Sequence, residues 1–172
     1  MNNVMDYAKW FIDNNLDTPR NNFKGNMKLQ KLLFFAQLIS LAKNDKLLFE
    51  DNFYAFENGM VVEDVRIAYK DHLCDLLKYE AKELPSEDIE ILQITKDIYG
   101  NEDADELSKM SHEFTYWKKY FERSRNRNNY KEKKLARVPN SELKKELDNI
   151  RDVLYVYETM NTNVNPDEDF DY

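Results

Sequence analysis

The longest stretch of apolar positions in the chain runs from Met27 to Ala42 and reads MKLQKLLFFAQLISLA. At helical spacing its apolar residues cover nearly the whole circumference instead of one stripe, and a helix of that kind is buried. At about 1.5 Å per residue it would be roughly 24 Å long. We therefore predict a central helix over 27–42, with Asn26 as its N-cap and the other elements packed around it. Lysines within the stretch and its short apolar runs argue against a membrane span.

Apolar residues recur at helical spacing in four other parts of the chain, and these patterns predict helices over 3–16, 62–76, 89–98 and 143–157. Asp103 followed by Glu106 has the form of a capping box, so we predict a further short helix from there through Met110.

Several segments lack a helical pattern. Leu47–Phe49 and Phe53–Phe56 are short, aromatic and bounded by acidic residues, which predicts brief strands or extended segments, with a turn at Glu57–Gly59. Between 118 and 137 the sequence interleaves basic residues with asparagines and has almost no aliphatic residues, which predicts an exposed loop.

These elements indicate a mainly α fold: a compact helical bundle around the central helix, with room for one short β-hairpin or extended segment. Only three glycines and four prolines occur in 172 residues, too few for a β-rich fold with many tight turns. We predict a single domain over 1–160, with the basic loop at about 122–138 inside it. The acidic residues 161–172 are expected to form a disordered tail.

Composition limits the compartment and the partners. The single cysteine, Cys74, excludes an internal disulfide and a cysteine-based zinc site, and it suits a reducing cytoplasm. The first fifteen residues are polar and acidic, so we expect no signal peptide. The net charge of −8 opposes general affinity for nucleic acid. We expect no membrane partner.

A search for catalytic chemistry is negative, and we predict a protein that is not an enzyme and has no cofactor, metal site or catalytic residue. His112-Glu113 lacks the second histidine that a zinc protease helix needs. Ser111-His112-Glu113 contains the residue types of a catalytic triad, but adjacency in sequence is not the geometry of one. The scattered glycines cannot form a phosphate loop. A hydrolase that uses His112 is the least favoured hypothesis.

The basic stretch allows three interpretations. It can be a solvated loop, which the acidic remainder of the chain favours. It can contact phosphates, with Tyr130 stacking on a base, as in a nucleic-acid-binding regulator. It can also contact an acidic face of a protein partner. The cations concerned are Arg123, Arg125, Arg127, Lys133 and Lys134.

Three separated blocks resemble one known family, the Panacea antitoxin domain, also described as SocA-like antitoxins or phage-associated GepA-like proteins. The central KLQKLLFFAQ, from Lys28 to Gln37, is similar to the family's KLQKLLYYAQ. FYAFENGMV, from Phe53, is similar to an extended F-x-A-W-x-x-G-P-V block. LSKMSH, from Leu107, with Trp117 following, is similar to L-S-x-x-T-H-x-x-x-x-W. The resemblance covers roughly residues 1–125.

This sequence departs from the family pattern at four positions, which are Phe56 for tryptophan, Met60 for proline, Ser111 for threonine and Tyr116 for proline. These departures put in doubt any partner specificity carried over from relatives.

The resemblance implies an antitoxin of a type II-like toxin–antitoxin pair, of bacterial or prophage origin, that neutralises a toxin encoded by a neighbouring gene through direct binding. In the SocA branch it implies instead a proteolytic adaptor that delivers the toxin to a ClpXP-type protease. We predict partner contacts at the signature positions Lys28, Gln30, Lys31, Gln37, Phe53, Phe56, Gly59, His112 and Trp117.

Gln30 and Gln37 fall on one narrow strip of the central helix. Because buried amides need hydrogen-bond partners, we expect this strip either to bond to the Phe53–Gly59 or His112 segments or to open onto a surface groove.

Overall fold

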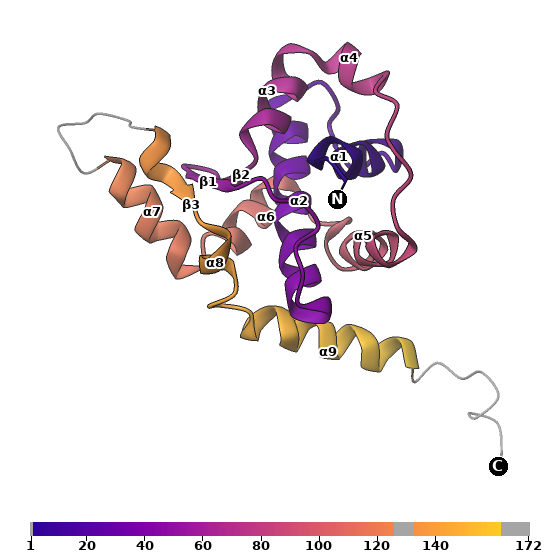
Figure 1. The fold of residues 1–172 in the computed structure, drawn as a ribbon, viewed down its shortest axis with the longest axis vertical. Coiled ribbons are helices and arrows are strands. Elements are labelled where there is room, and N and C mark those ends of the chain that lie inside the picture. Colours follow the sequence, from indigo (N-terminus) through magenta and orange to yellow (C-terminus); the bar gives the residue numbers. More distant parts are fainter. Residues whose placement is uncertain (1, 126–132, 163–172) are drawn as a thin grey trace.

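Helix α2 (Phe23–Asn44) crosses the middle of the molecule, as the ribbon of the computed structural model shows (Figure 1). The structure describes residues 2–125 and 133–162. Every residue of α2 from Gly25 to Leu41 is buried, which confirms the predicted central helix. The predicted start at Asn26 is wrong, since the helix begins four residues earlier. Asn22 is the N-cap and accepts a hydrogen bond from the Lys24 amide at 2.9 Å, whereas the Asn26 side chain donates to the Arg66 carbonyl at 3.1 Å.

Most of the remaining helices pack around α2. Helices α1 and α5 lie on one side of it, and the small sheet lies on the other (Figure 1). Those in contact with α2 are α1 (Val4–Asp13), α3 (Glu63–Asp71), α5 (Ser86–Tyr99), α6 (Ala104–Ser111) and α9 (Asp148–Thr162).

One predicted helix is two in the structure. The range 62–76 divides into α3 and α4 (Leu73–Leu77), because His72 between them has non-helical backbone angles of φ −138° and ψ 39°. The apolar repeat continues through this break, so periodicity alone does not reveal it. The predicted cap of α6 is present: the Glu106 amide donates to the Asp103 carboxylate at 2.8 Å.

The small sheet is built on the predicted turn. Strands β1 (Phe53–Phe56) and β2 (Gly59–Val61) form an antiparallel hairpin, with Phe56 opposite Gly59. Strand β3 (Arg137–Val138) pairs with the other edge of β1, so the strand order is β2-β1-β3. The prediction of a strand at Phe53–Phe56 is confirmed, whereas Leu47–Phe49 has no regular structure.

The loop predicted over 118–137 is wrong for most of its length. Helix α7 (Thr115–Arg125) continues to Arg125, and η1 (Lys133–Ala136), a turn of 3₁₀ helix, leads into β3. Tyr116, Tyr120 and Ser124 recur every four residues and are buried, which gives α7 a packed face despite its charge. The central part of the predicted basic loop, residues 126–132, lies outside the described residues.

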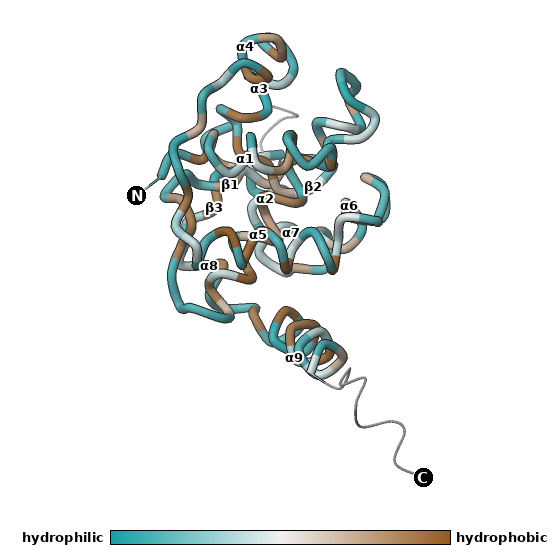
Figure 2. The backbone as a smooth tube through the Cα atoms, turned by 90° about the vertical axis from the view of Figure 1, so that its right-hand side faces the viewer, coloured by the Kyte–Doolittle hydropathy of each residue, from teal (hydrophilic) through white to brown (hydrophobic). Residues whose placement is uncertain are grey.

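The last predicted helix, 143–157, corresponds to α8 (Asn140–Leu143) and α9 with a break between them. Helix α9 lies at one edge of the molecule, and its C-terminal end points away from the body (Figures 1 and 2). It continues to Thr162, and the remainder of the predicted acidic tail, 163–172, lies outside the described residues.

The core gathers on α2, which contributes the largest share of its buried apolar side chains. Phe34 lies at an aromatic centre, with T-shaped contacts to Phe53 and Phe114 at ring distances of 5.4 Å. The mainly α fold class is confirmed, including the central buried helix and the short hairpin. Within 2–125 and 133–162, no helix combines the length and the apolar character that crossing a membrane requires.

Candidate partner-binding groove

The two glutamines of α2 hydrogen-bond to the backbone of neighbouring segments. Gln30 accepts from the Val62 amide at 2.9 Å and donates to the Asn26 side chain at 3.0 Å. Gln37 donates to the Phe49 carbonyl at 2.8 Å and accepts from the Leu48 amide at 2.8 Å. The oxygen and the nitrogen of both side-chain amides are therefore hydrogen-bonded, although both side chains are buried. Gln30 bonds just beyond the Phe53–Gly59 segment, and Gln37 bonds to the segment before it.

The two lysines of the motif donate hydrogen bonds to different parts of the chain. Lys28 donates to the Gly100 carbonyl at 2.7 Å, and Lys31 donates to the Met60 carbonyl at 3.0 Å. Lys31 is fully buried, and burial lowers the pKa of its amine from its ordinary value of 10.5 to about 7. Lys31 also lies against Gly59, whose φ of +110° suits glycine.

The third motif block holds the other side of the hairpin. The Ser108 hydroxyl donates to the Asn58 carbonyl at 2.7 Å, and the Trp117 indole donates to the Phe56 carbonyl at 2.8 Å. His112 stacks on Trp117 with ring centroids 3.9 Å apart. Burial and the nearby Lys31 charge lower the pKa of His112, although its hydrogen bond to the Glu57 backbone opposes them. The β1–β2 hairpin, which carries the second motif block, is therefore the point on which the first and third blocks converge, through Lys31, Ser108 and Trp117.

This convergence can be tested at Trp117. Trp117→Phe keeps an aromatic ring but removes the donor to the Phe56 carbonyl. We expect the free energy of unfolding, measured by chemical denaturation, to fall by about 1 kcal/mol. Trp10→Phe is the matched control, because Trp10 is also half-buried and its indole makes no hydrogen bond to the described residues. Equal losses in the two variants would contradict a specific role for the indole donor.

A groove of about 620 Å³ lies beside this hairpin. Its volume is in the range typical of ligand pockets. Residues of α2, β1, β2, α3, α7 and η1 line it, together with the end of the loop before α2. Its apolar lining includes Phe23, Met27, Phe56, Val61 and Phe121. Phe23, the first residue of α2, is 67% exposed, so a large aromatic ring faces solvent at the groove wall.

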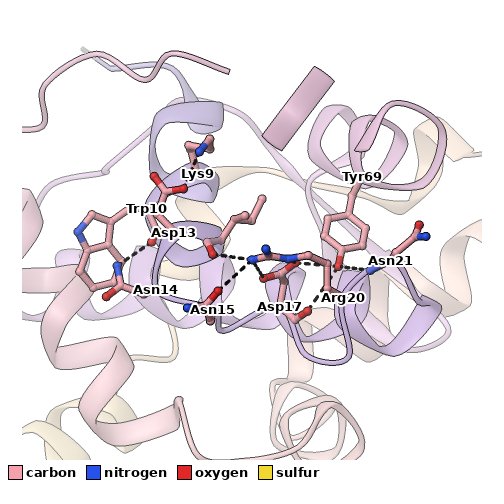
Figure 3. A network of polar contacts seen from close by, with 10 residues as sticks. Lys9, Trp10, Asp13, Asn14, Asn15, Asp17, Arg20, Asn21 and Tyr69 are labelled. Carbon is pink, nitrogen blue, oxygen red and sulfur yellow. Dashed lines mark hydrogen bonds and ion pairs between the residues drawn. The ribbon is translucent and has the colours of Figure 1, made fainter. Parts of the chain in front are cut away.

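A polar network holds the loop that presents Phe23 (Figure 3). The Arg20 guanidinium donates to both Asp17 carboxylate oxygens at 3.0 Å and to the Ile12 carbonyl at 2.7 Å. The Tyr69 hydroxyl, from α3, donates to Asp17 at 2.9 Å and accepts from the Asn21 amide at 3.1 Å. Burial and the bond to Asp17 raise the pKa of Tyr69. The loop is therefore tied to both α1 and α3.

Charged residues connect the groove walls. Glu63 of α3 forms ion pairs with Arg66 of the same helix and with Lys133 of η1. Burial raises the pKa of the Glu63 carboxyl, but the hydrogen bonds from these two cations outweigh it and keep the pKa below its ordinary value. Glu63 therefore stays ionised and joins α3 to η1 across the groove.

The predicted site residues separate into three groups. Gln30, Lys31 and Phe56 line the groove. Gly59, His112 and Trp117 lie behind it and hold the hairpin, whereas Lys28, Gln37 and Phe53 are buried elsewhere along α2 and β1. Among the predicted cations, Arg125 and Lys133 line the groove, Arg123 and Lys134 are exposed outside it, and Arg127 lies outside the described residues.

Sequence patterns do not single out Phe23, Arg66 or Lys70, although all three line the groove. Phe23 lies before the predicted start of the central helix, and Arg66 and Lys70 are polar positions between the apolar positions of the predicted 62–76 helix. The one available signal was Asn22, a good N-cap placed just before an isolated aromatic residue in a polar segment. Choosing Asn22 as the cap would have put Phe23 on the first turn of α2.

A family model described as antitoxin SocA-like, Panacea domain, matches residues 29–118, just over half of the chain. The chain belongs to this family. The suspected resemblance is thereby confirmed, and family membership indicates an antitoxin role with a toxin as partner in general. It also points to a protein that acts without catalysis. No curated protein and no solved structure matches the chain.

The Panacea domain supplies only part of the groove. The hairpin, α3 and most of α2 lie inside the matched range, whereas Phe23, Phe121, Arg125 and Lys133 lie outside it. The groove therefore combines walls that carry the family motif with walls contributed by the flanking sequence.

Proposed function

We propose that this Panacea-domain protein neutralises a partner toxin by direct protein–protein binding, and that the groove beside the hairpin is the contact surface. The observation that carries the proposal is the groove itself, which is lined by three signature positions, Gln30, Lys31 and Phe56. Hydrogen bonds from Lys31, Ser108 and Trp117 hold the hairpin that forms one wall.

Phe23 supports the choice of this surface. Aromatic residues are enriched among the few side chains that dominate binding energy at interfaces. Phe23 is largely exposed, yet its loop is held by the network of Asp17, Arg20 and Tyr69. A held aromatic ring loses little conformational entropy on binding, because the backbone that carries it is already ordered.

The test is co-expression with the product of the adjacent gene. We expect that product to arrest growth when expressed alone, growth to be restored by the antitoxin, and the two proteins to co-purify. Phe23→Ser should weaken the complex about tenfold or more, the loss typical of an interface anchor. Tyr155→Ser on α9 is the matched control, because Tyr155 is 72% exposed and does not line the groove.

Two results would contradict the proposal. A neighbouring product that is harmless alone, or that forms no complex, would overturn direct neutralisation. A complex that tolerates Phe23→Ser as well as it tolerates Tyr155→Ser would overturn the assignment to the groove.

The alternative of proteolytic delivery differs in the fate of the toxin. If direct binding suffices, the toxin persists in the complex whether or not a ClpXP-type protease is present. If the protein is an adaptor, toxin levels fall only in cells that contain the protease. Immunoblots of the toxin in the two backgrounds therefore separate the mechanisms.

A further inference from the structure

The groove differs in charge from the molecule as a whole. The chain has a net charge of −8. Among the described residues, the groove is lined by four surface cations, Arg66, Lys70, Arg125 and Lys133, and by two carboxylates, Glu57 and Glu63. An acidic protein therefore carries a local excess of positive charge at its candidate contact surface.

Ion pairs among the groove residues do not neutralise this excess of positive charge. Glu63 is shared by Arg66 and Lys133, and Glu57 lies 3.5 Å from Arg125. Lys70 is exposed and forms no ion pair within the part of the chain that the structure describes. Counted over 2–125 and 133–162, two positive charges on the groove walls consequently have no compensating carboxylate.

The cations are combined with aromatic rings on both sides of the groove. The Arg66 guanidinium lies 5.7 Å from the centre of the Phe56 ring, and the Arg125 guanidinium lies 4.5 Å from that of Phe121. A guanidinium that stacks on a ring keeps in-plane N–H groups for carboxylate oxygens. Together with the exposed ring of Phe23, these pairs offer apolar contact area and anion recognition in one place.

We propose that the groove binds an acidic segment of the toxin that also carries a large apolar side chain. This inference rests on the proposed function and specifies the chemistry of the partner. The apolar side chain contacts Phe23, Phe56 and Phe121, while Asp or Glu side chains beside it pair with Lys70 and the two arginines. Complementary charge of this kind speeds association and selects among partners.

The same charges favour a protein segment over nucleic acid. A short acidic segment brings a few carboxylates into the groove and leaves the rest of the acidic surface uninvolved. An extended polyanion would continue past the groove onto a molecule whose net charge repels it.

The first experiment measures the affinity of the full-length antitoxin for the adjacent gene product at 50 mM and at 500 mM salt. Lys70→Glu should weaken the complex about fivefold or more at low salt, and salt should remove most of this effect by screening. Lys144→Glu is the matched control, because Lys144 is also exposed, is unpaired among the described residues and does not line the groove. The Phe23→Ser loss should persist at both salt concentrations.

A second experiment uses a probe of defined chemistry, the labelled peptide acetyl-Glu-Asp-Phe-Glu-Leu-Asp-amide, and its counterpart with Gln and Asn in place of the acids. Fluorescence anisotropy should show binding of the acidic peptide at low salt, weakened by Lys70→Glu and by Phe23→Ser but not by Lys144→Glu. The amide peptide should bind at least tenfold more weakly.

The outcomes are distinguishable. Absence of any complex with wild type would overturn the proposed function, whereas a complex indifferent to Lys70→Glu and to salt would overturn only this inference. Equal binding of the two peptides would also overturn it. Tighter binding of a single-stranded oligonucleotide than of the acidic peptide would reassign the groove to nucleic acid. Salt-sensitive self-association of the antitoxin, lost in Lys70→Glu, would reassign it to a second copy of this chain.

Discussion

Gly59→Ala is expected to lower the free energy of unfolding by about 4 kcal/mol and the melting temperature by about 10 °C. Gly59 has a φ of +110°, where a residue with a Cβ is strained. A Cβ placed there would lie 2.2 Å from the Ser111 hydroxyl oxygen and 2.5 Å from Cε of Lys31. Backbone strain and overpacking therefore act together at the turn of the hairpin.

Asn58→Ala serves as the control for Gly59→Ala. Asn58 is the neighbouring exposed residue of the same turn, and its bond to Ser108 uses the backbone carbonyl, which the substitution retains. Its stability should change by less than about 0.5 kcal/mol. Adding Ser111→Ala to Gly59→Ala should recover part of the loss, because it removes the closest contact. Equal effects of the two single substitutions in thermal and chemical denaturation would contradict this explanation.

The second large effect is a pH-dependent stability that depends on Lys31. In the unfolded chain the amine has its ordinary pKa of 10.5, whereas burial lowers the pKa to about 7 in the folded protein. Between these values the unfolded chain binds more protons, so the free energy of unfolding rises with pH. From pH 7 to pH 9 the titration of Lys31 should therefore raise the free energy of unfolding by about 2 kcal/mol, as the penalty for burying the charged amine is relieved.

Lys31→Met isolates this contribution. The substitution removes the titrating amine at similar length, and the unpaired Met60 carbonyl that it leaves adds a cost that does not vary with pH. Chemical denaturation at pH 7, 8 and 9 should therefore show a rise in wild type that is missing from the variant. Lys144→Met, which removes an exposed lysine, should keep the wild-type slope. Equal slopes in wild type and Lys31→Met would contradict burial of a titrating amine.

Both effects concern the hairpin, and the hairpin forms one wall of the groove. Gly59 forms its turn and Lys31 and Trp117 hydrogen-bond to its carbonyls, while Phe56 faces the groove. A change at these supporting residues should therefore reduce toxin binding through the position of the hairpin. Changes at Phe23 or Lys70 should reduce binding without loss of stability, which separates support from contact.

Whether a helix could be predicted from the sequence depended on how clear its apolar repeat was. The central helix was predictable because its apolar positions leave almost no polar face. The break at His72 was not, since the apolar repeat runs through it. Helix α7 was missed because its buried face uses tyrosines and a serine among many charges, and periodicity is weak when polar residues fill buried positions.

The sequence predicted the motif residues of the site, but it did not predict which of them face the groove. The signature blocks identified Gln30, Lys31, Phe56, Gly59 and Trp117, but a sequence pattern does not distinguish a residue that holds a wall from one that faces the groove. That distinction depends on which side of the hairpin each side chain approaches. Lys31 and Trp117 bond to its backbone carbonyls, whereas Phe56 lies beneath the Arg66 guanidinium.

The sequence by itself determined the buried central helix, the hairpin turn, the family and the acidic character of the chain, because each rests on neighbouring residues or on a simple sum. Only the tertiary structure decided where the groove lies. Phe23, Arg66 and Lys133 come from three elements distant in sequence, and long-range packing brings them together. The local positive charge follows from the same packing, since it depends on which charged residues are brought to the groove and not on the composition of any one segment.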